Sequence, residues 1–420
     1  MGIVYRLLGR AGVSQRRIAA LTGQAQPEVC EILQGRRVRD VEVLERIADG
    51  LGVPRGWMRL GSGEDGRSAG QEVAEDVKRR ALISATAVAA LGQVVPGSGE
   101  PSGLPLPTGR LPSRLGMSHV QAVVAVTGQL RGVARYYGGQ GGLFGAAAAL
   151  YSRWLPVPDT PEVVTAELAA ALAELHTEAG WRSYDSGLDV TGCVTRALGL
   201  ARRAGDAHGV ANAALHAGMT LVRSGHPNDA LTLFQLGQLP LSGSLPGTST
   251  PVVPRADDPR LPTVAARLAR QSATAYALTG CSDQATRCLA EADEGWAPRD
   301  AFEHAGADFV TAGIHLDLGQ LDTAGQFAAS AVRTYTEAHR RGRAQARLLL
   351  TEVHIRAGEP HGLTLAHHAI DEVSTLQSVA VRRERLKPLA TALETRPSTS
   401  TGTGTHELAQ LTRKIAATRI

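Results

Sequence analysis

The sequence predicts an all-α protein in which a small N-terminal helical domain precedes a long array of paired helices. The chain is 43% hydrophobic but only 4% aromatic, and it is rich in alanine and leucine, which have high helix propensities. Between residues 118 and 388, helical periodicity is interrupted only by short turns and by one Ser/Pro/Gly-rich loop at 240–262. Glycines recur at a nearly constant spacing in this region, which indicates repeated helix pairs.

Breaks in the pattern divide the 420 residues into four parts. Proline and glycine cluster between the first domain and the helical array, and serine, threonine and glycine cluster after it. The predicted parts are a helix-turn-helix domain at 1–60, a linker at 61–117 with a connector helix at 72–91 and a proline-rich segment, an α-solenoid at 118–395, and a flexible linker with a C-terminal helix at 396–420.

The net charge of +4 is concentrated in the first domain. Residues 1–60 hold ten arginines against six acidic residues, so the remaining 360 residues are balanced. A basic domain on a neutral body indicates an anionic partner that contacts only this domain, most commonly nucleic acid.

Capping signals define the helices of the first domain. Ser14 is the expected N-cap of a first helix that ends at Gly23 and turns Ile18, Ala19 and Leu21 inward. Pro27 suits the first turn of a second helix, which buries Val29, Ile32 and Leu33. Asp40 is expected to cap a third helix with an apolar face of Val41, Leu44, Ile47, Ala48 and Leu51.

Two short helices joined by a glycine-bearing turn can present the second helix to a major groove. The run Gly12-Val-Ser-Gln-x5-Leu-Thr-Gly, followed by Val29-x-x-Ile-x-x-Gly-Arg, resembles the Cro-like (XRE) family of DNA-binding domains over residues 2–60. The resemblance implies double-stranded DNA as a partner. It implies DNA contacts by Gln15, Arg16, Gln24, Gln26, Pro27, Cys30, Glu31, Arg36 and Arg37.

Gln26 is the expected reader of sequence in this domain, since an amide pairs well with adenine. Gln15 falls on the family's phosphate-binding position at a helix N-terminus, where an anion is favoured. Glu28 and Glu31 on the second helix leave open an alternative in which this domain contacts another protein instead of DNA.

Five glycines give the register of the body. They are spaced by 38, 55, 39 and 39 residues, and the 240–262 loop accounts for the longer interval; they are Gly187, Gly225, Gly280, Gly319 and Gly358. A small residue recurs seven positions earlier in most repeats. This pattern resembles the tetratricopeptide repeat over about 160–390, with a longer period and few of that family's aromatic positions. An unrelated helical bundle is the alternative.

The first helix of each pair is expected to line a concave surface. Its offsets in the resembled family predict a peptide or small-molecule effector site at Trp181, Tyr184, Asn212, Met219, Arg223, Arg267, Arg270 and Thr274. Aromatic, amide and guanidinium groups together suit such a ligand. In the alternative, the connector helix or the proline-rich segment already fills this groove.

Other sequence features indicate no enzyme, cofactor, metal site or membrane span. The four cysteines lack C-x-x-C spacing, which is typical of a reducing compartment. The longest apolar run, residues 81–95, is too short to cross a bilayer. Arg79-Arg80 resembles an export signal but lies far from the N-terminus, so we expect a cytoplasmic protein.

Together these features predict a sequence-specific transcriptional regulator whose helical-repeat body senses a ligand and mediates homodimerisation. Such a combination resembles the peptide-responsive regulators of Gram-positive bacteria, and its composition resembles the actinomycete members. The rival hypothesis is a scaffold or anti-regulator that binds a partner protein through its helical repeats and reads no DNA.

Overall fold

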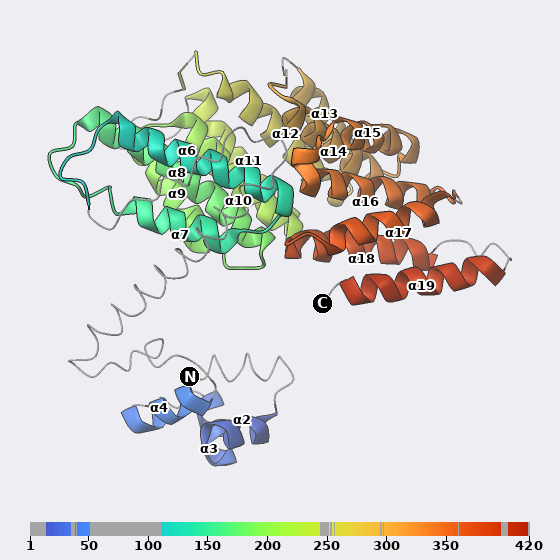
Figure 1. The fold of residues 1–420 in the computed structure, drawn as a ribbon, viewed down its shortest axis with the longest axis horizontal. Helices are drawn as coiled ribbons and strands as arrows, with labels where there is room; N and C mark the ends of the chain where they lie inside the picture. The colour runs from blue at the N-terminus through green and yellow to red at the C-terminus, as the bar shows by residue number, and fades with distance from the viewer. Residues whose placement is uncertain are drawn as a thin grey trace. The chain divides into compact units, whose positions relative to one another are not determined.

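The computed structural model describes residues 14–34, 38, 40–50, 111–243, 252, 254–255, 257–294, 296, 298–359, 361–395 and 402–418. Within these residues every regular element is a helix, which confirms the predicted all-α class (Figure 1). The chain divides into two compact units, Met1–Arg80 and Ala81–Ile420. The predicted connector helix at 72–91 and the proline-rich segment lie outside the described residues.

The described part of the first unit contains three short helices, α2 (Gln15–Thr22), α3 (Gln26–Leu33) and α4 (Val41–Gly50). Ser14 caps α2 by accepting a hydrogen bond from the backbone N–H of Arg17, and Gly23 ends it in the left-handed conformation. Asp40 accepts from the backbone N–H of Glu42 at the start of α4. The buried core of the three helices consists of Ile18, Ala19, Val29, Ile32 and Ile47.

The prediction that Leu21 faces this core is wrong. Leu21 is 38% exposed, whereas Thr22 is buried and its hydroxyl donates to the carbonyl of Ile18. Residues 18, 19 and 22 share one face of α2, and position 21 lies at the edge of that face. The side chains of Val41, Ala48 and Leu51, also expected in the core, lie outside the described residues.

The second unit is built from fourteen described α-helices. Two short 3-10 helices, Leu239–Ser242 and Glu337–His339, also belong to this unit. The α-helices are α6 (Met117–Tyr137), α7 (Gly141–Ser152), α8 (Glu162–Asp185), α9 (Thr191–Ala204), α10 (Ala207–Arg223), α11 (Pro227–Gln238), α12 (Arg260–Leu278), α13 (Ser282–Asp293), α14 (Ala301–Asp317), α15 (Leu321–Thr334), α16 (Arg340–Arg356), α17 (His361–Ser374), α18 (Val379–Thr395) and α19 (Gly402–Thr418).

From α8 to α17 the helices pack as consecutive pairs, and a glycine stands in the turn within each pair. All five turn glycines have positive φ, between 74° and 86°, as the predicted register requires; they are Gly187, Gly225, Gly280, Gly319 and Gly358. Glycine adopts this left-handed conformation without the steric cost that a Cβ atom imposes. The sequence spacing therefore located the turns of these five pairs correctly.

Small residues allow the two helices of a pair to approach closely. A Cβ atom at Gly218 of α10 would lie only 2.3 Å from Cε1 of Phe234 on α11. At Gly180 of α8 it would lie 3.3 Å from Cγ2 of Val194 on α9. These contacts explain why the sequence repeats a small residue seven positions before the turn glycine.

The first helices of the pairs form one layer, in which α8, α10, α12, α14 and α16 contact one another in order. We call this the inner layer. It curves far enough for α16 to contact α6 and for α18 to contact α8 (Figure 1). The second helix of each pair packs against this inner layer.

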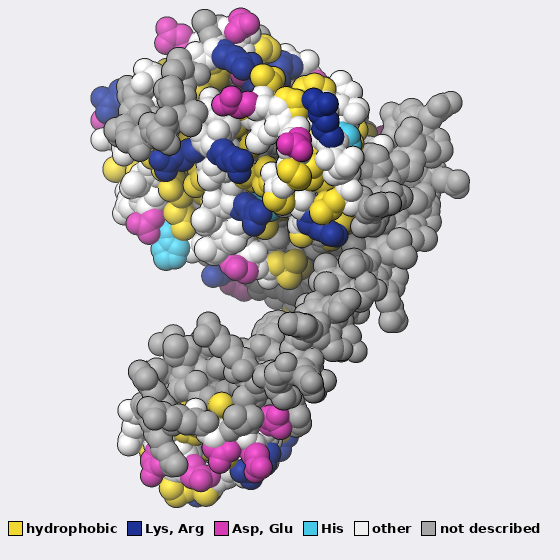
Figure 2. All heavy atoms as spheres, turned by 90° about the vertical axis from the view of Figure 1, so that its left-hand side faces the viewer, with side chains coloured by type: hydrophobic (Ala, Val, Ile, Leu, Met, Phe, Trp, Pro, Cys, Tyr) yellow, Lys and Arg dark blue, Asp and Glu magenta, His cyan; other side chains and the backbone are white. Residues whose placement is uncertain are grey.

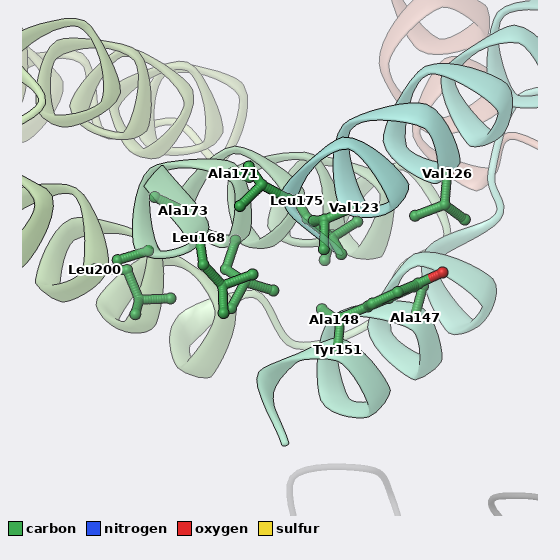
Figure 3. Packing of buried hydrophobic residues seen from close by; sticks show 14 of the residues in the cluster. Val123, Val126, Ala147, Ala148, Tyr151, Leu168, Ala171, Ala173, Leu175 and Leu200 are labelled. Atoms are coloured by element: carbon green, nitrogen blue, oxygen red, sulfur yellow. The ribbon is translucent and has the colours of Figure 1, made fainter. Parts of the chain in front are cut away.

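The largest apolar core joins α6, α7 and α8. Tyr151 and Phe144 of α7 are completely buried there, against Leu168 and Leu172 of α8 (Figure 3 shows part of this cluster). Full burial of each such side chain contributes about 1.5–3 kcal/mol. None of the helices in the described part of the chain combines the length and apolarity that a membrane span requires.

Candidate functional site

The predicted DNA-contact residues lie at the N-terminal ends of α2 and α3. Gln15 and Arg16 occupy the first turn of α2, and Gln26 and Pro27 occupy the first turn of α3; all four are exposed. Unpaired backbone N–H groups and the helix dipole favour an anion at such positions. The geometry therefore leaves two amide side chains accessible at helix starts.

Two other residues of this predicted set contribute to the local structure. Gln24 is half-buried, and its side-chain oxygen accepts a hydrogen bond from Thr22 in the turn before α3. Cys30 is also half-buried, and its Sγ atom lies 3.7 Å from Nε2 of Gln34. Arg36 and Arg37 lie outside the described residues.

Acidic side chains accompany the predicted contact residues on α3. Glu28 is exposed and accepts from the backbone N–H of Ala25, which closes the first turn of the helix. Glu31 is exposed one turn later. Acidic and basic side chains both gather on the face of this unit that Figure 2 shows.

In the second unit, Trp181 and Tyr184 of α8 stack with their ring centroids 5.8 Å apart. The guanidinium of Arg223 lies 5.1 Å from the centre of the Trp181 ring, and Met219 packs at the edge of the cluster. Four of the eight predicted ligand-contact residues thus lie together. Trp181 and Tyr184 are only 8% and 7% exposed.

Helix α18 covers this aromatic pair. Glu384 accepts hydrogen bonds from the hydroxyl of Tyr184 and from Nη1 of Arg223, the latter at 2.6 Å, and Ala380 packs against the rings. Burial and the bond to Glu384 raise the pKa of Tyr184 to about 12. The expected open surface at Trp181 and Tyr184 is therefore occupied by the chain's own helix, which sequence reasoning did not foresee.

The remaining predicted ligand-contact residues surround α12. Arg267 donates to Oδ1 of Asn212 at 3.5 Å and makes no ion pair with any described residue. Arg270 donates to Asp293 at 2.6 Å, and its guanidinium lies 4.1 Å from the centre of the Trp296 ring. Thr274 donates to the carbonyl of Arg270 within its own helix.

Arg270 keeps two buried N–H groups, Nε and Nη1, without a hydrogen-bond partner among the described residues, although the side chain is nearly enclosed. Of the predicted ligand-contact residues around α12, Arg267 and Thr274 are half-buried, whereas Asn212 and Arg270 are buried. The predicted site is divided in two, with one half closed by α18 and the other centred on Arg267.

A network that the sequence did not reveal closes the curve of the inner layer. Asp185 is fully buried and accepts hydrogen bonds from Arg341, from the hydroxyl of Ser378 and from the backbone N–H of Gly139. Although burial alone would raise it, these partners hold the pKa of Asp185 at about 2. Arg341 lies in the first turn of α16.

Glu178 is a second buried carboxylate on α8, about two helical turns before Asp185. Glu178 accepts from Arg131 at 2.8 Å and from Arg182 at 3.1 Å. Burial opposes its ionisation, but the two guanidinium groups hold the pKa of Glu178 well below its usual range. The inner layer is therefore densely charged, and most of its carboxylates are committed to arginines.

Comparison of the chain with protein-family models and with curated proteins found no match in either case. In the part of the chain that the structure describes, no three His, Cys, Asp or Glu side chains are grouped as a metal site would require. The proposals below consequently rest on the geometry and charge of the two units.

Proposed function

We propose that this chain is a sequence-specific DNA-binding transcriptional regulator. The first unit acts as a Cro-like helix-turn-helix domain, and the second, a tetratricopeptide-like solenoid, senses a ligand and mediates dimerisation. The observation that carries the proposal is the pairing of α2 and α3 across the Gly23 turn, with Gln15 and Gln26 exposed at the two helix starts. The ten arginines in residues 1–60 support an anionic partner.

In this proposal α3 enters the major groove of DNA. The amide of Gln26, in its first turn, makes a bidentate contact with adenine, which contributes about 1–3 kcal/mol of discrimination between bases. Gln15 binds a backbone phosphate at the start of α2, which positions the domain without reading sequence. Pro27 contributes an apolar surface beside Gln26 that fits a thymine methyl group.

The paired helices of the second unit support a sensing role. Their inner layer carries arginines, amides and aromatic rings from helices that are far apart in sequence. A ligand that binds one curvature of this layer better than another shifts the balance between the two states, and therefore the spacing of two DNA-binding domains in a dimer.

The proposal is tested by fluorescence anisotropy of the full chain with DNA from upstream of its own gene. Gln15→Ala is expected to weaken binding to all sequences, and Gln26→Ala to weaken binding at one base position. Gln121→Ala, an exposed glutamine of α6, is the matched control and should bind as the unaltered protein does. Equal affinity of all four proteins for DNA contradicts the proposal.

A second function is favoured by the exposed Glu28 and Glu31 on α3, because carboxylates repel DNA phosphates. In that alternative the chain is a scaffold or anti-regulator that binds a partner protein. Absence of DNA binding at low salt, where electrostatic attraction is strongest, would favour it.

A further inference from the structure

The two ends of the helical array in the second unit meet through hydrogen bonds and one small apolar cluster. The backbone N–H of Gln377, in the turn before α18, donates to the carbonyl of Tyr137 in α6 at 2.8 Å. The side chain of Gln140, in the turn after α6, donates to that of Gln377 at 2.6 Å. We call the contacts of residues 377–384 with α6, with the turn after it, and with α8 and α10 the seam.

Apolar packing joins α18 mainly to α16, α17 and α19. Three buried leucines of α18 belong to a core shared with those helices; they are Leu386, Leu389 and Leu393. The core of α6, α7 and α8 is a separate cluster. The apolar cluster of the seam consists of Trp181, Tyr184 and Ala380, so α18 contributes a single methyl group to it. Because apolar burial is the main force between packed helices, α18 is held more strongly by its own end of the array than by α8.

The buried ion pair at the seam does not prevent the two ends from separating. Asp185 accepts hydrogen bonds from Arg341 and from the hydroxyl of Ser378. When the seam opens, water reaches both charges at once, so neither is left buried without its partner. The hydration that each charge regains offsets much of the attraction that is lost. Opening the seam therefore costs less than removing either partner by substitution.

Glu384 of α18 makes the most specific contact of the seam. Its carboxylate accepts from the hydroxyl of Tyr184 and, at 2.6 Å, from Nη1 of Arg223. The guanidinium of Arg223 lies 5.1 Å from the centre of the Trp181 ring. The side chains of Glu384 and Arg223 are 13% and 18% exposed, so solvent reaches this ion pair. Tyr184 and Arg223 can donate in the same way to a carboxylate that does not belong to this chain.

We propose that the seam opens and that Trp181, Tyr184 and Arg223 then bind an amphipathic helix of another protein, which carries a small apolar residue four positions before a glutamate. Ala380 and Glu384 have this spacing on one face of α18, so α18 occupies the site as an internal competitor. The incoming helix covers the same rings and pairs with the same arginine. An effect on DNA binding rests on the proposed function, whereas the binding of the helix does not.

Fluorescence anisotropy of the full chain with a labelled peptide tests the proposal. The probe has the sequence of residues 379–395, and a control probe carries Glu384→Gln as its only change. In the unaltered chain its own Glu384 competes, so we expect weak binding of the probe. The chain with Glu384→Gln should bind the probe at least tenfold more tightly, because its own α18 has lost the charge that pairs with Arg223. The control probe should bind that chain at least tenfold more weakly than the probe does.

Further variants identify the group that receives the carboxylate. Arg223→Met, added to Glu384→Gln, should weaken probe binding at least tenfold, because the carboxylate of the probe loses its cation. Arg223→Lys in the same background keeps the charge and should retain most of the binding. Glu291→Gln, at an exposed position of α13, is the matched control for Glu384→Gln and should bind the probe as weakly as the unaltered chain does. Circular dichroism of each variant checks that its helices are formed.

Chemical cross-linking reports whether the seam opens. Gln140→Cys and Gln377→Cys place two thiols where the glutamine side chains are hydrogen-bonded in the closed seam. In the chain with Glu384→Gln, a short bismaleimide should join the two cysteines when the probe is absent. Saturating probe should reduce the yield at least threefold. Gln140→Cys alone is the control for reaction of the native cysteines.

Three results would overturn the proposal: no binding of the probe by the chain with Glu384→Gln, equal binding with and without Arg223→Met, or a cross-link that saturating probe leaves unchanged. If the unlabelled, unaltered chain competes as strongly as unlabelled probe, the site belongs to a second copy of this chain and not to another protein. Anisotropy with DNA on the same samples separates the two proposals. Probe binding without DNA binding leaves the helix site standing and removes the regulatory function, and DNA binding without probe binding does the reverse.

Discussion

Asp185 of α8 and Arg341 of α16 form a buried ion pair across 156 residues of sequence, with Oδ1 and Nη2 2.5 Å apart. Ser378, in the turn before α18, donates to the same carboxylate. One side chain therefore joins the first of the regular helix pairs to the last.

Replacing Asp185 by asparagine should destabilise the second unit by about 3–5 kcal/mol, because Arg341 would keep a buried charge without its partner. Urea unfolding of the full chain followed by circular dichroism measures this effect. Asp371→Asn is the control, since Asp371 pairs with Lys414 at the surface and should contribute less than about 1 kcal/mol. Similar losses of unfolding free energy in the two variants would show that the buried ion pair does not stabilise the curved inner layer.

Stability should also fall between pH 6.5 and pH 4. Burial lowers the pKa of His176 and His216 to about 4, so in this interval the unfolded chain binds protons that the folded chain does not. The free energy of unfolding must therefore rise with pH there and level off above the unfolded value of about 6.5. His216→Gln should make the dependence shallower in urea titrations at several pH values, and an unchanged slope would contradict the assignment.

The close approach of α10 and α11 predicts that Gly218→Ala costs about 1–3 kcal/mol, because the new methyl group would overlap the Phe234 ring. Gly199 of α9 is the matched control, with open space where its Cβ would lie. Alanine there should stabilise the protein by roughly 0.5–1 kcal/mol through helix propensity. Thermal unfolding of the two variants should give shifts of opposite sign; a stabilising Gly218→Ala would mean that the helices have room to spare.

Local features were predictable from the sequence because they depend on neighbouring residues. Ser14, Gly23 and the five turn glycines act within one or two helical turns, and the structure places them as the pattern requires. The prediction that Leu21 is buried was wrong because a side chain at the edge of a short helix face can point toward the core or toward solvent. The C-terminal helix predicted within 396–420 is present as α19, Gly402–Thr418.

The candidate ligand site was predictable only in part. The repeat register identified Trp181, Tyr184 and Arg267, since all three lie on first helices of pairs. It did not identify Glu384, which lies 200 residues from Tyr184 and beyond Gly358, the last of the five glycines that set the register. Contacts that close a curved array depend on the summed geometry of every pair, and no local spacing encodes that sum.

The proposed regulator should be a homodimer, because one recognition helix contacts too few base pairs for a specific operator. Light scattering is expected to give a mass of about twice 44.0 kDa for the free protein and two chains per DNA site. A monomer both free and on DNA would remove the proposed coupling between ligand and DNA, although not DNA binding itself.

The most direct test of the central claim is the affinity of the full chain for DNA, measured by anisotropy over a range of salt concentrations, with and without Gln26→Ala. We predict that affinity falls steeply with salt, as several phosphate contacts require. Gln26→Ala should lose about 1–3 kcal/mol on the preferred sequence and nothing on a sequence altered at the base that Gln26 contacts. An identical affinity of the unaltered protein and Gln26→Ala for every sequence would contradict the account.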